Sequence, residues 1–243
     1  MLNRGWKATD QISDFKMFDK TPYEQPDTIA VMEVIISGIR DEEKLYGPAF
    51  TSRVINYALQ AVASQTGEEP PKDVQTLERL KEYLLSKTEK LSFPPYYLLL
   101  WAEFITAKKL EGSLGAGYRI SHRGIIKRVA ETDDNVKLLQ KLGIDQVLLK
   151  IHQFAVEKKV APLELGYRKN EDGSIDIMYG GCYFFDACQL AKEKKLLQRS
   201  DGQLLCGTST FVCQFLRMAT GYEWDYTILE FGKAHCIIKC FMI

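Results

Sequence analysis

The stretch "LELGYRKNEDGSIDIMYGG", residues 163–181, decides the fold of this 243-residue chain. Apolar side chains alternate along it, and "NEDG" interrupts the alternation at its centre. An alternation of period two indicates a strand with one buried face, and a turn ending in Asp-Gly between two such runs favours a β-hairpin. The segment therefore predicts two antiparallel strands that share one apolar face, formed by Leu165, Tyr167, Ile175, Ile177 and Tyr179.

The residues after this hairpin predict two helices and a second hairpin. "CYFFDACQLAKEKKLL" (residues 182–197) and "TSTFVCQFLRMATG" (residues 208–221) have helical spacing, and the second ends at a glycine. "YEWDYTILEFG" (residues 222–232) and "HCIIKCFMI" (residues 235–243) alternate again. Residues 163–243 thus predict a ββααββ unit with a four-stranded antiparallel sheet and helices on one face.

The residues before the hairpin are helical in pattern. From Pro48 onward the apolar positions repeat with the helical period, and "PPYYLLLWAEFITAKKL" (residues 94–110) is apolar nearly all round, which predicts a central buried helix. Residues 1–28 are polar and aperiodic and are expected to form an N-terminal arm. We therefore expect an α+β fold in one domain, residues 29–243, with a helical N-terminal half packed on the sheet.

Composition excludes several classes of protein. The chain has 32 basic and 32 acidic residues, so no net charge attracts nucleic acid or anionic lipid. The most apolar run, residues 96–105, is about half of the roughly 20 residues that a membrane span needs. The start of the sequence has no apolar core of a secretory signal. We expect a cytoplasmic protein with no nucleic-acid partner and no membrane span.

Cysteine is confined to the last part of the chain, and nothing in the sequence indicates secretion. All the cysteines follow residue 181: Cys182, Cys188, Cys206, Cys213, Cys236 and Cys240. Reduced thiols in a cytosolic protein bind metal, react, or fill the core. Cys206 precedes a helix, and the positive end of the helix dipole predicts a lowered pKa for its thiol. Cys206 is therefore the thiol most suited to function.

The order of elements, with three of these positions, resembles the V4R (4-vinyl-reductase-like, hydrocarbon-binding) domain and the related TRAPP fold. Cys182 follows the second strand, Cys206 precedes the last helix, and Gly232 with Cys236 fits a Gly-x3-Cys pattern. The resemblance implies a sensor or carrier for a hydrophobic or aromatic small molecule, with zinc as a stabilising ion and a homodimer as the assembly.

The resemblance also implies where zinc binds. The ligand set it suggests is Cys206 with Cys236 or Cys240, completed by His235, Glu230 or Asp225. In a continuous strand, Cys236 and Cys240 lie on one face but about 13 Å apart, at about 3.3 Å per residue. Two thiolates that each lie about 2.3 Å from one zinc ion cannot be so far apart, so at most one of them binds it. The alternative is that both are apolar filler of a core strand.

Aromatic residues are dense in the same unit and predict the wall of an apolar pocket. The candidate ligand-binding residues are Tyr183, Phe184, Phe211, Phe215, Trp224 and Tyr226. The alternative is an aromatic core without a pocket.

Two other functions stay open at this point. The late Thr227, Gly232 and Cys236 are similar to the ending of L-2-amino-thiazoline-4-carboxylic acid hydrolases, which implies a cysteine-dependent hydrolase with Cys206 or Cys236 as nucleophile. A TRAPP-like dimeric scaffold is the other, and it would need exposed apolar surface in place of a pocket.

Overall fold

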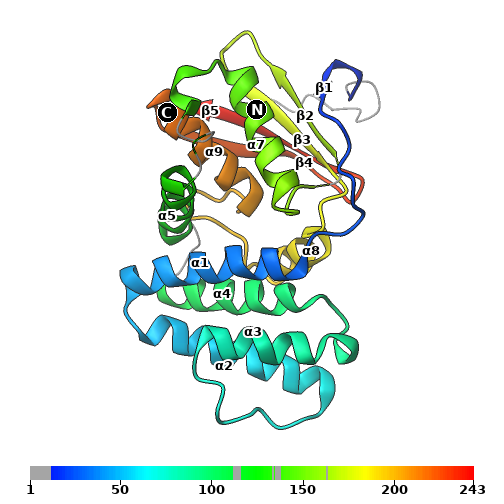
Figure 1. Cartoon of the computed structure of the whole chain (residues 1–243), viewed down its shortest axis with the longest axis vertical. Coiled ribbons are helices and arrows are strands. Elements are labelled where there is room, and N and C mark those ends of the chain that lie inside the picture. The colour runs from blue at the N-terminus through cyan, green and yellow to red at the C-terminus, as the bar shows by residue number, and fades with distance from the viewer. Residues whose placement is uncertain (1–11, 112–115, 133, 135–137, 163) are drawn as a thin grey trace.

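The computed structural model describes residues 12–243 apart from 112–115, 133, 135–137 and 163, and these residues form a layered α+β structure (Figure 1). The helices are α1 (Thr28–Tyr46), α2 (Ala49–Thr66), α3 (Leu77–Ser86), α4 (Pro95–Glu111), α5 (Ala116–Thr132), α7 (Ile144–Glu157), α8 (Phe185–Glu193) and α9 (Gly207–Thr220). Short 3-10 turns lie at Ile12–Asp14, Thr88–Lys90 and Leu138–Lys141. The strands are β1 (Lys16–Met17), β2 (Glu164–Lys169), β3 (Ile175–Gly180), β4 (Trp224–Phe231) and β5 (His235–Met242).

The helical N-terminal half is confirmed, and local chemistry explains where its helices begin. The side chain of Asp27 accepts a hydrogen bond from the Ala30 N–H at the start of α1, and Thr76 caps α3 in the same way. Pro95 opens α4, where a missing N–H costs nothing. Helix α4 is buried on almost every side, as its all-round apolar sequence predicts.

The sheet has five strands rather than the four expected, in the order β1-β2-β3-β5-β4, with every neighbouring pair antiparallel. The additional strand comes from the segment interpreted as an arm, where Lys16 pairs with Tyr167 of β2. Two residues are too few to leave an alternating pattern in the sequence. They pair because β2 would otherwise present an open edge of backbone donors and acceptors.

The first hairpin forms as predicted between β2 and β3. Gly173 takes the left-handed conformation with φ of 80°, and Asp172 accepts a hydrogen bond from the Ser174 N–H inside the turn. The apolar side chains of both strands, together with those of β4 and β5, pack under α7 and α9 in one buried cluster. The helices therefore lie on one face of the sheet. A small cluster of Phe15, Met178 and Ile237 lies apart from this cluster.

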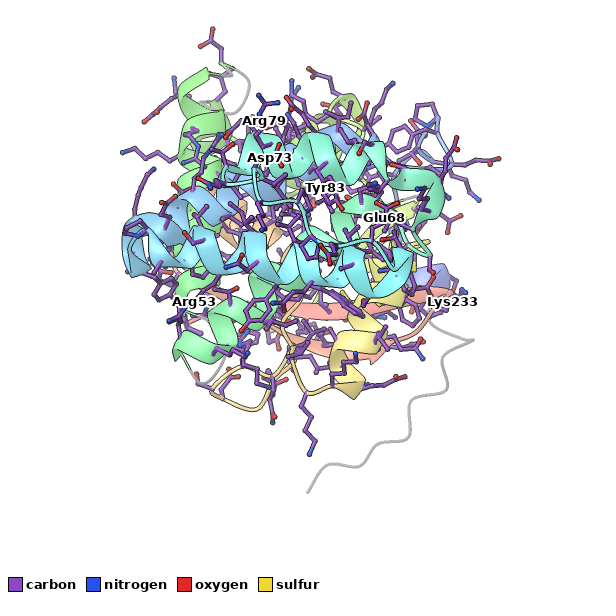
Figure 2. The ribbon with its side chains drawn as sticks, turned by 90° about the horizontal axis from the view of Figure 1, so that it is seen from below. Arg53, Glu68, Asp73, Arg79, Tyr83 and Lys233 are labelled. Carbon is purple, nitrogen blue, oxygen red and sulfur yellow. The ribbon has the colours of Figure 1, made fainter. Side chains whose placement is uncertain are left out.

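The core is divided into two parts. One cluster joins α1, α2, α3 and α4 to α8, and the other joins α5, α7 and α9 to the sheet. Figure 2 shows that α2 and α3 form the outer face of the helical part, with Arg53 and Arg79 on it. The C-terminal strand β5 lies inside the sheet between β3 and β4, and Cys240 is fully buried. None of the described helices is long and apolar enough to cross a membrane.

Candidate functional site

A cavity of about 190 Å³ lies where the two core clusters meet. Its wall is formed by side chains from α1, α4, α5, α7, α8 and α9, from β2 and β3, and from the connecting segments, so no single element creates it. Most of the wall is apolar or aromatic. Its residues are Val31, Val34, Ile35, Gly38, Leu100, Glu103, Phe104, His122, Ile125, Ile151, His152, Phe154, Ala155, Lys158, Val160, Ala161, Pro162, Leu165, Tyr179, Cys182, Tyr183, Phe184, Cys188, Leu205, Cys206, Gly207, Thr208, Phe211 and Val212.

The structure divides the predicted aromatic residues between the cavity and the core. Tyr183, Phe184 and Phe211 line the cavity. The Tyr183 hydroxyl donates to the Val160 carbonyl at 2.5 Å, which holds its ring at the wall. Phe211 is only partly buried, since one side of it borders empty space.

The other three predicted residues, Phe215, Trp224 and Tyr226, belong to the buried cluster above the sheet. Phe215 packs edge-on against Phe211, with ring centroids 4.9 Å apart. The Trp224 indole N–H donates to the Thr220 hydroxyl at 2.9 Å. The Tyr226 hydroxyl accepts from the Cys206 backbone N–H at 2.7 Å. These hydrogen bonds satisfy the polar atoms of the two buried rings, which is the role of core aromatics.

The N-terminal segment shapes one side of the cavity through His152. The ring of Phe18 stacks on the His152 ring at 5.0 Å between centroids, and His152 Nε2 lies 3.1 Å from the Asp19 carbonyl. Burial lowers the pKa of His152, which favours the neutral ring. With Nε2 donating to the carbonyl, Nδ1 is a buried acceptor to which the described residues give no partner. The segment taken as a loose arm thus completes the wall behind a cavity residue.

An acidic pair beside the cavity was not predicted from the sequence. Glu103 of α4 lines the cavity and is 2% exposed, and Glu42 of α1 is 1% exposed. Burial raises the pKa of Glu103 well above its usual value, and the neighbouring Glu42 carboxyl group raises it further. The sequence does contain an indication that Glu103 is unusual. In "YYLLLWAEFI" it is the single charged residue in a run that predicts a buried helix. Nothing distinguishes Glu42 in "IRDEEKLY".

The predicted low pKa of Cys206 is wrong. Its thiol lines the cavity at the start of α9, and the backbone N–H groups of Thr208 and Ser209 do lower its pKa. Complete burial is the larger effect and raises the pKa above its usual value. Burial likewise raises the pKa of Cys182 to about 12. Burial also raises the pKa of Cys188, the third cysteine of the wall, so all three cavity thiols are held protonated.

The candidate metal ligands have other partners. His235 Nε2 lies 3.0 Å from Glu230 Oε1, and side-chain alternation puts His235 on the opposite face of β5 from the two cysteines. Cys240 Sγ lies 3.7 Å from Cys213 Sγ in the core, and Cys236 Sγ lies 3.6 Å from the Gly232 carbonyl oxygen.

Asp225 accepts two hydrogen bonds from the buried guanidinium group of Arg199, which is 6% exposed. The two bonds reach the two carboxylate oxygens, at 2.9 Å and 2.8 Å. Among the residues that the structure describes, no three His, Cys, Asp or Glu side chains are grouped to hold a metal ion. Zinc at Cys206 stays a prediction, which metal analysis of the purified protein tests.

Comparison with known proteins identifies no family for the chain. No family model matches the sequence, and no curated protein matches it. Among solved structures, the chain is similar to an oxygen-binding H-NOX domain related to soluble guanylate cyclases, seen in its oxygen complex. The two are 13% identical with a TM-score of 0.39, over 85% of this chain and 91% of that one. A likeness this remote assigns no function.

Proposed function

We propose that this protein binds a small hydrophobic or aromatic molecule in the cavity between its two core clusters, as a sensor or carrier of the V4R type. The observation that carries the proposal is the cavity itself, about 190 Å³ of space enclosed mainly by apolar and aromatic side chains. Binding sites for small molecules are typically of this kind, apolar with a few polar groups that orient the ligand.

The volume limits the size of the molecule. An apolar cavity of about 150 Å³ accommodates benzene. The cavity of about 190 Å³ therefore suits one aromatic ring with one or two small substituents. Because the wall is built from both halves of the domain, a bound ring would contact both core clusters at once. Such a ligand would stabilise the interface between them.

The thiols of the cavity favour binding over the alternative of a cysteine-dependent hydrolase. A nucleophilic cysteine acts as the thiolate, which requires a low pKa. Burial raises the pKa of all three cavity thiols, Cys182, Cys188 and Cys206. It also raises the pKa of Cys236, the other candidate nucleophile, to about 11. A scaffold of the TRAPP type would not require an internal cavity. The homodimer implied by the same resemblance stays a prediction, and light scattering during size-exclusion chromatography measures it.

The test is to fill the cavity and compare binding of a neutral probe. Val212 of α9 is 3% exposed and lines the cavity, so Val212→Phe places extra volume in it. Ile29 of α1 is 53% exposed, and Ile29→Phe is the matched control. Toluene is titrated into each protein by NMR, with circular dichroism to establish that each variant is folded.

We expect toluene to bind the wild type and Ile29→Phe with equal affinity and Val212→Phe at least about tenfold more weakly. Equal binding by a folded Val212→Phe variant, or no binding by the wild type, would contradict the proposal. Native mass spectrometry of the purified protein identifies any small molecule that remains bound.

A further inference from the structure

We propose that the cavity selects a molecule that carries a positively charged nitrogen next to its ring, an amine or an amidine, and that Glu103 with Glu42 receives this nitrogen. The inference rests on the proposed function and narrows the class of its ligand. It is carried by the buried carboxyl group of Glu103 in a mainly apolar wall, with the buried carboxyl group of Glu42 beside it.

The two carboxyl groups come from neighbouring helices at the boundary of the cavity. Helices α1 and α4 lie side by side below α7 and α9, and α5 packs against α1 (Figure 1). All five helices contribute residues to the cavity wall. Glu103 lines the cavity directly, and Gly38, one helical turn before Glu42, lines it from α1. Since Gly38 has no side chain, it leaves space beside the helix that carries Glu42.

The chemistry of the pair matches a cation with N–H donors. Two ionised carboxylates side by side in a buried site repel each other, so burial and this repulsion favour a proton on one of them. An ammonium or amidinium group that enters the cavity supplies its own donors and its own positive charge. It can replace this proton, which leaves to solvent, and form charge-assisted hydrogen bonds to the carboxylate in a low-dielectric site. Burial raises the pKa of Glu103, and a cation beside the carboxyl group would favour its ionised form.

The charged lysine of the wall is already paired outside the cavity. The Lys158 side chain is 51% exposed, and its ammonium group lies 3.2 Å from Glu157 Oε1. Lys158 is therefore a rim residue in contact with water. The two histidines of the wall are His122 of α5 and His152 of α7. The His122 ring packs edge-on against Phe211, with ring centroids 6.1 Å apart. The acidic pair would repel a ligand carboxylate, so the site should prefer a cationic ligand to an anionic one.

The experiment compares three probes with one ring each: benzylamine, toluene and benzoate. Isothermal titration at pH 7 measures their affinities for the wild type and for Glu103→Gln, which keeps the shape of the side chain while removing its ionisable group. Glu89, on the short turn after α3, is exposed, and Glu89→Gln is the matched control.

We expect the wild type to bind benzylamine about tenfold or more tightly than toluene, and benzoate more weakly than toluene, as a charge-assisted hydrogen bond implies. In Glu103→Gln the ratio of the benzylamine affinity to the toluene affinity should fall by about tenfold or more. Glu89→Gln should behave as the wild type.

The outcomes separate this inference from the proposed function. If toluene binds the wild type but benzylamine binds no better, or benzoate binds best, the inference is wrong and the proposed function stands. If the preference for benzylamine survives in a folded Glu103→Gln variant, Glu103 is not its cause and the inference is wrong. If none of the probes binds the wild type, the proposed function itself fails. The comparison of probes on the wild type decides the matter even where the variant does not fold.

Discussion

Truncation of Phe215 and of Phe211 should have different consequences, although the two rings are four residues apart on α9. Phe215 is 1% exposed and is enclosed by the cluster above the sheet, whereas Phe211 is partly buried and borders the cavity. A ring removed from a closed core leaves a new void, because the surroundings relax only in part. A ring removed from a cavity wall enlarges a space that already exists.

The magnitudes follow from this difference. Phe215→Ala should lower the free energy of unfolding by about 3–5 kcal/mol. Phe211→Ala removes a ring with less area buried and should cost about 1–2 kcal/mol. For a domain of this size, about 2–4 °C is lost per kcal/mol, so the melting temperature should fall by about 6–20 °C for Phe215→Ala and about 2–8 °C for Phe211→Ala. Tyr222, which is 64% exposed, provides a control, and Tyr222→Ala should cost less than about 0.5 kcal/mol.

Urea unfolding followed by circular dichroism measures the three values, and the slope with denaturant shows whether all variants unfold in the same way. Toluene binding by the folded variants provides the second measurement, because Phe211→Ala changes the wall that the ligand contacts. A loss for Phe211→Ala as large as that for Phe215→Ala would refute the division between cavity wall and core. Unchanged toluene affinity in Phe211→Ala would refute its place in the wall.

Three further outcomes are expected. Burial raises the pKa of Glu103 above its usual 4.5, so the folded protein retains a proton that the unfolded chain has released. The stability of the wild type should therefore fall relative to that of Glu103→Gln as the pH rises through and above 4.5. Equal dependence of the two stabilities on pH in urea titrations would contradict this. Iodoacetamide should label Cys182 and Cys206 much more slowly in the native protein than in urea, because burial raises the pKa of both thiols. Peptide mass spectrometry measures the labelling, and rapid labelling of either thiol in the native protein would argue for the hydrolase. Asp225 also pairs with Arg119 at 2.7 Å, so Asp225→Asn removes a carboxylate shared by two arginines and leaves the buried Arg199 with Asp201 alone. The variant should lose about 1–3 kcal/mol in thermal unfolding, and an unchanged stability would contradict this role of Asp225.

Several features of the fold are contained in short stretches of sequence. The alternation within residues 163–181 predicts β2, β3 and their turn, because side chains that alternate across a strand report directly which face is buried. The apolar run in residues 94–110 predicts a buried helix for the same kind of reason, and α4 is that helix. Both depend on interactions between residues that are close in the chain. Pattern and structure therefore agree there.

Tertiary contacts determine whether the two-residue strand β1 forms and whether an aromatic ring lies in the cavity wall or in the core. Lys16 and Met17 form a strand only because the edge of β2 is adjacent. Phe211 and Phe215 belong to one amphipathic pattern, yet Phe211 lines the cavity and Phe215 lies in the core cluster above the sheet. Alternation along one strand gives no information about what covers it.

The sequence by itself determined the α+β class, the order of the elements after residue 163, and the inward position of the strand that ends the chain. Only the tertiary structure decided the site. A cavity is the volume that two packed layers fail to fill, and it depends on the sizes and angles of helices that are distant in sequence. The same packing sets the dielectric around Cys206 and brings Glu42 and Glu103 together. A pattern along the chain records which side chains avoid water, whereas the protonation of a thiol or a carboxyl group depends on what surrounds it in space.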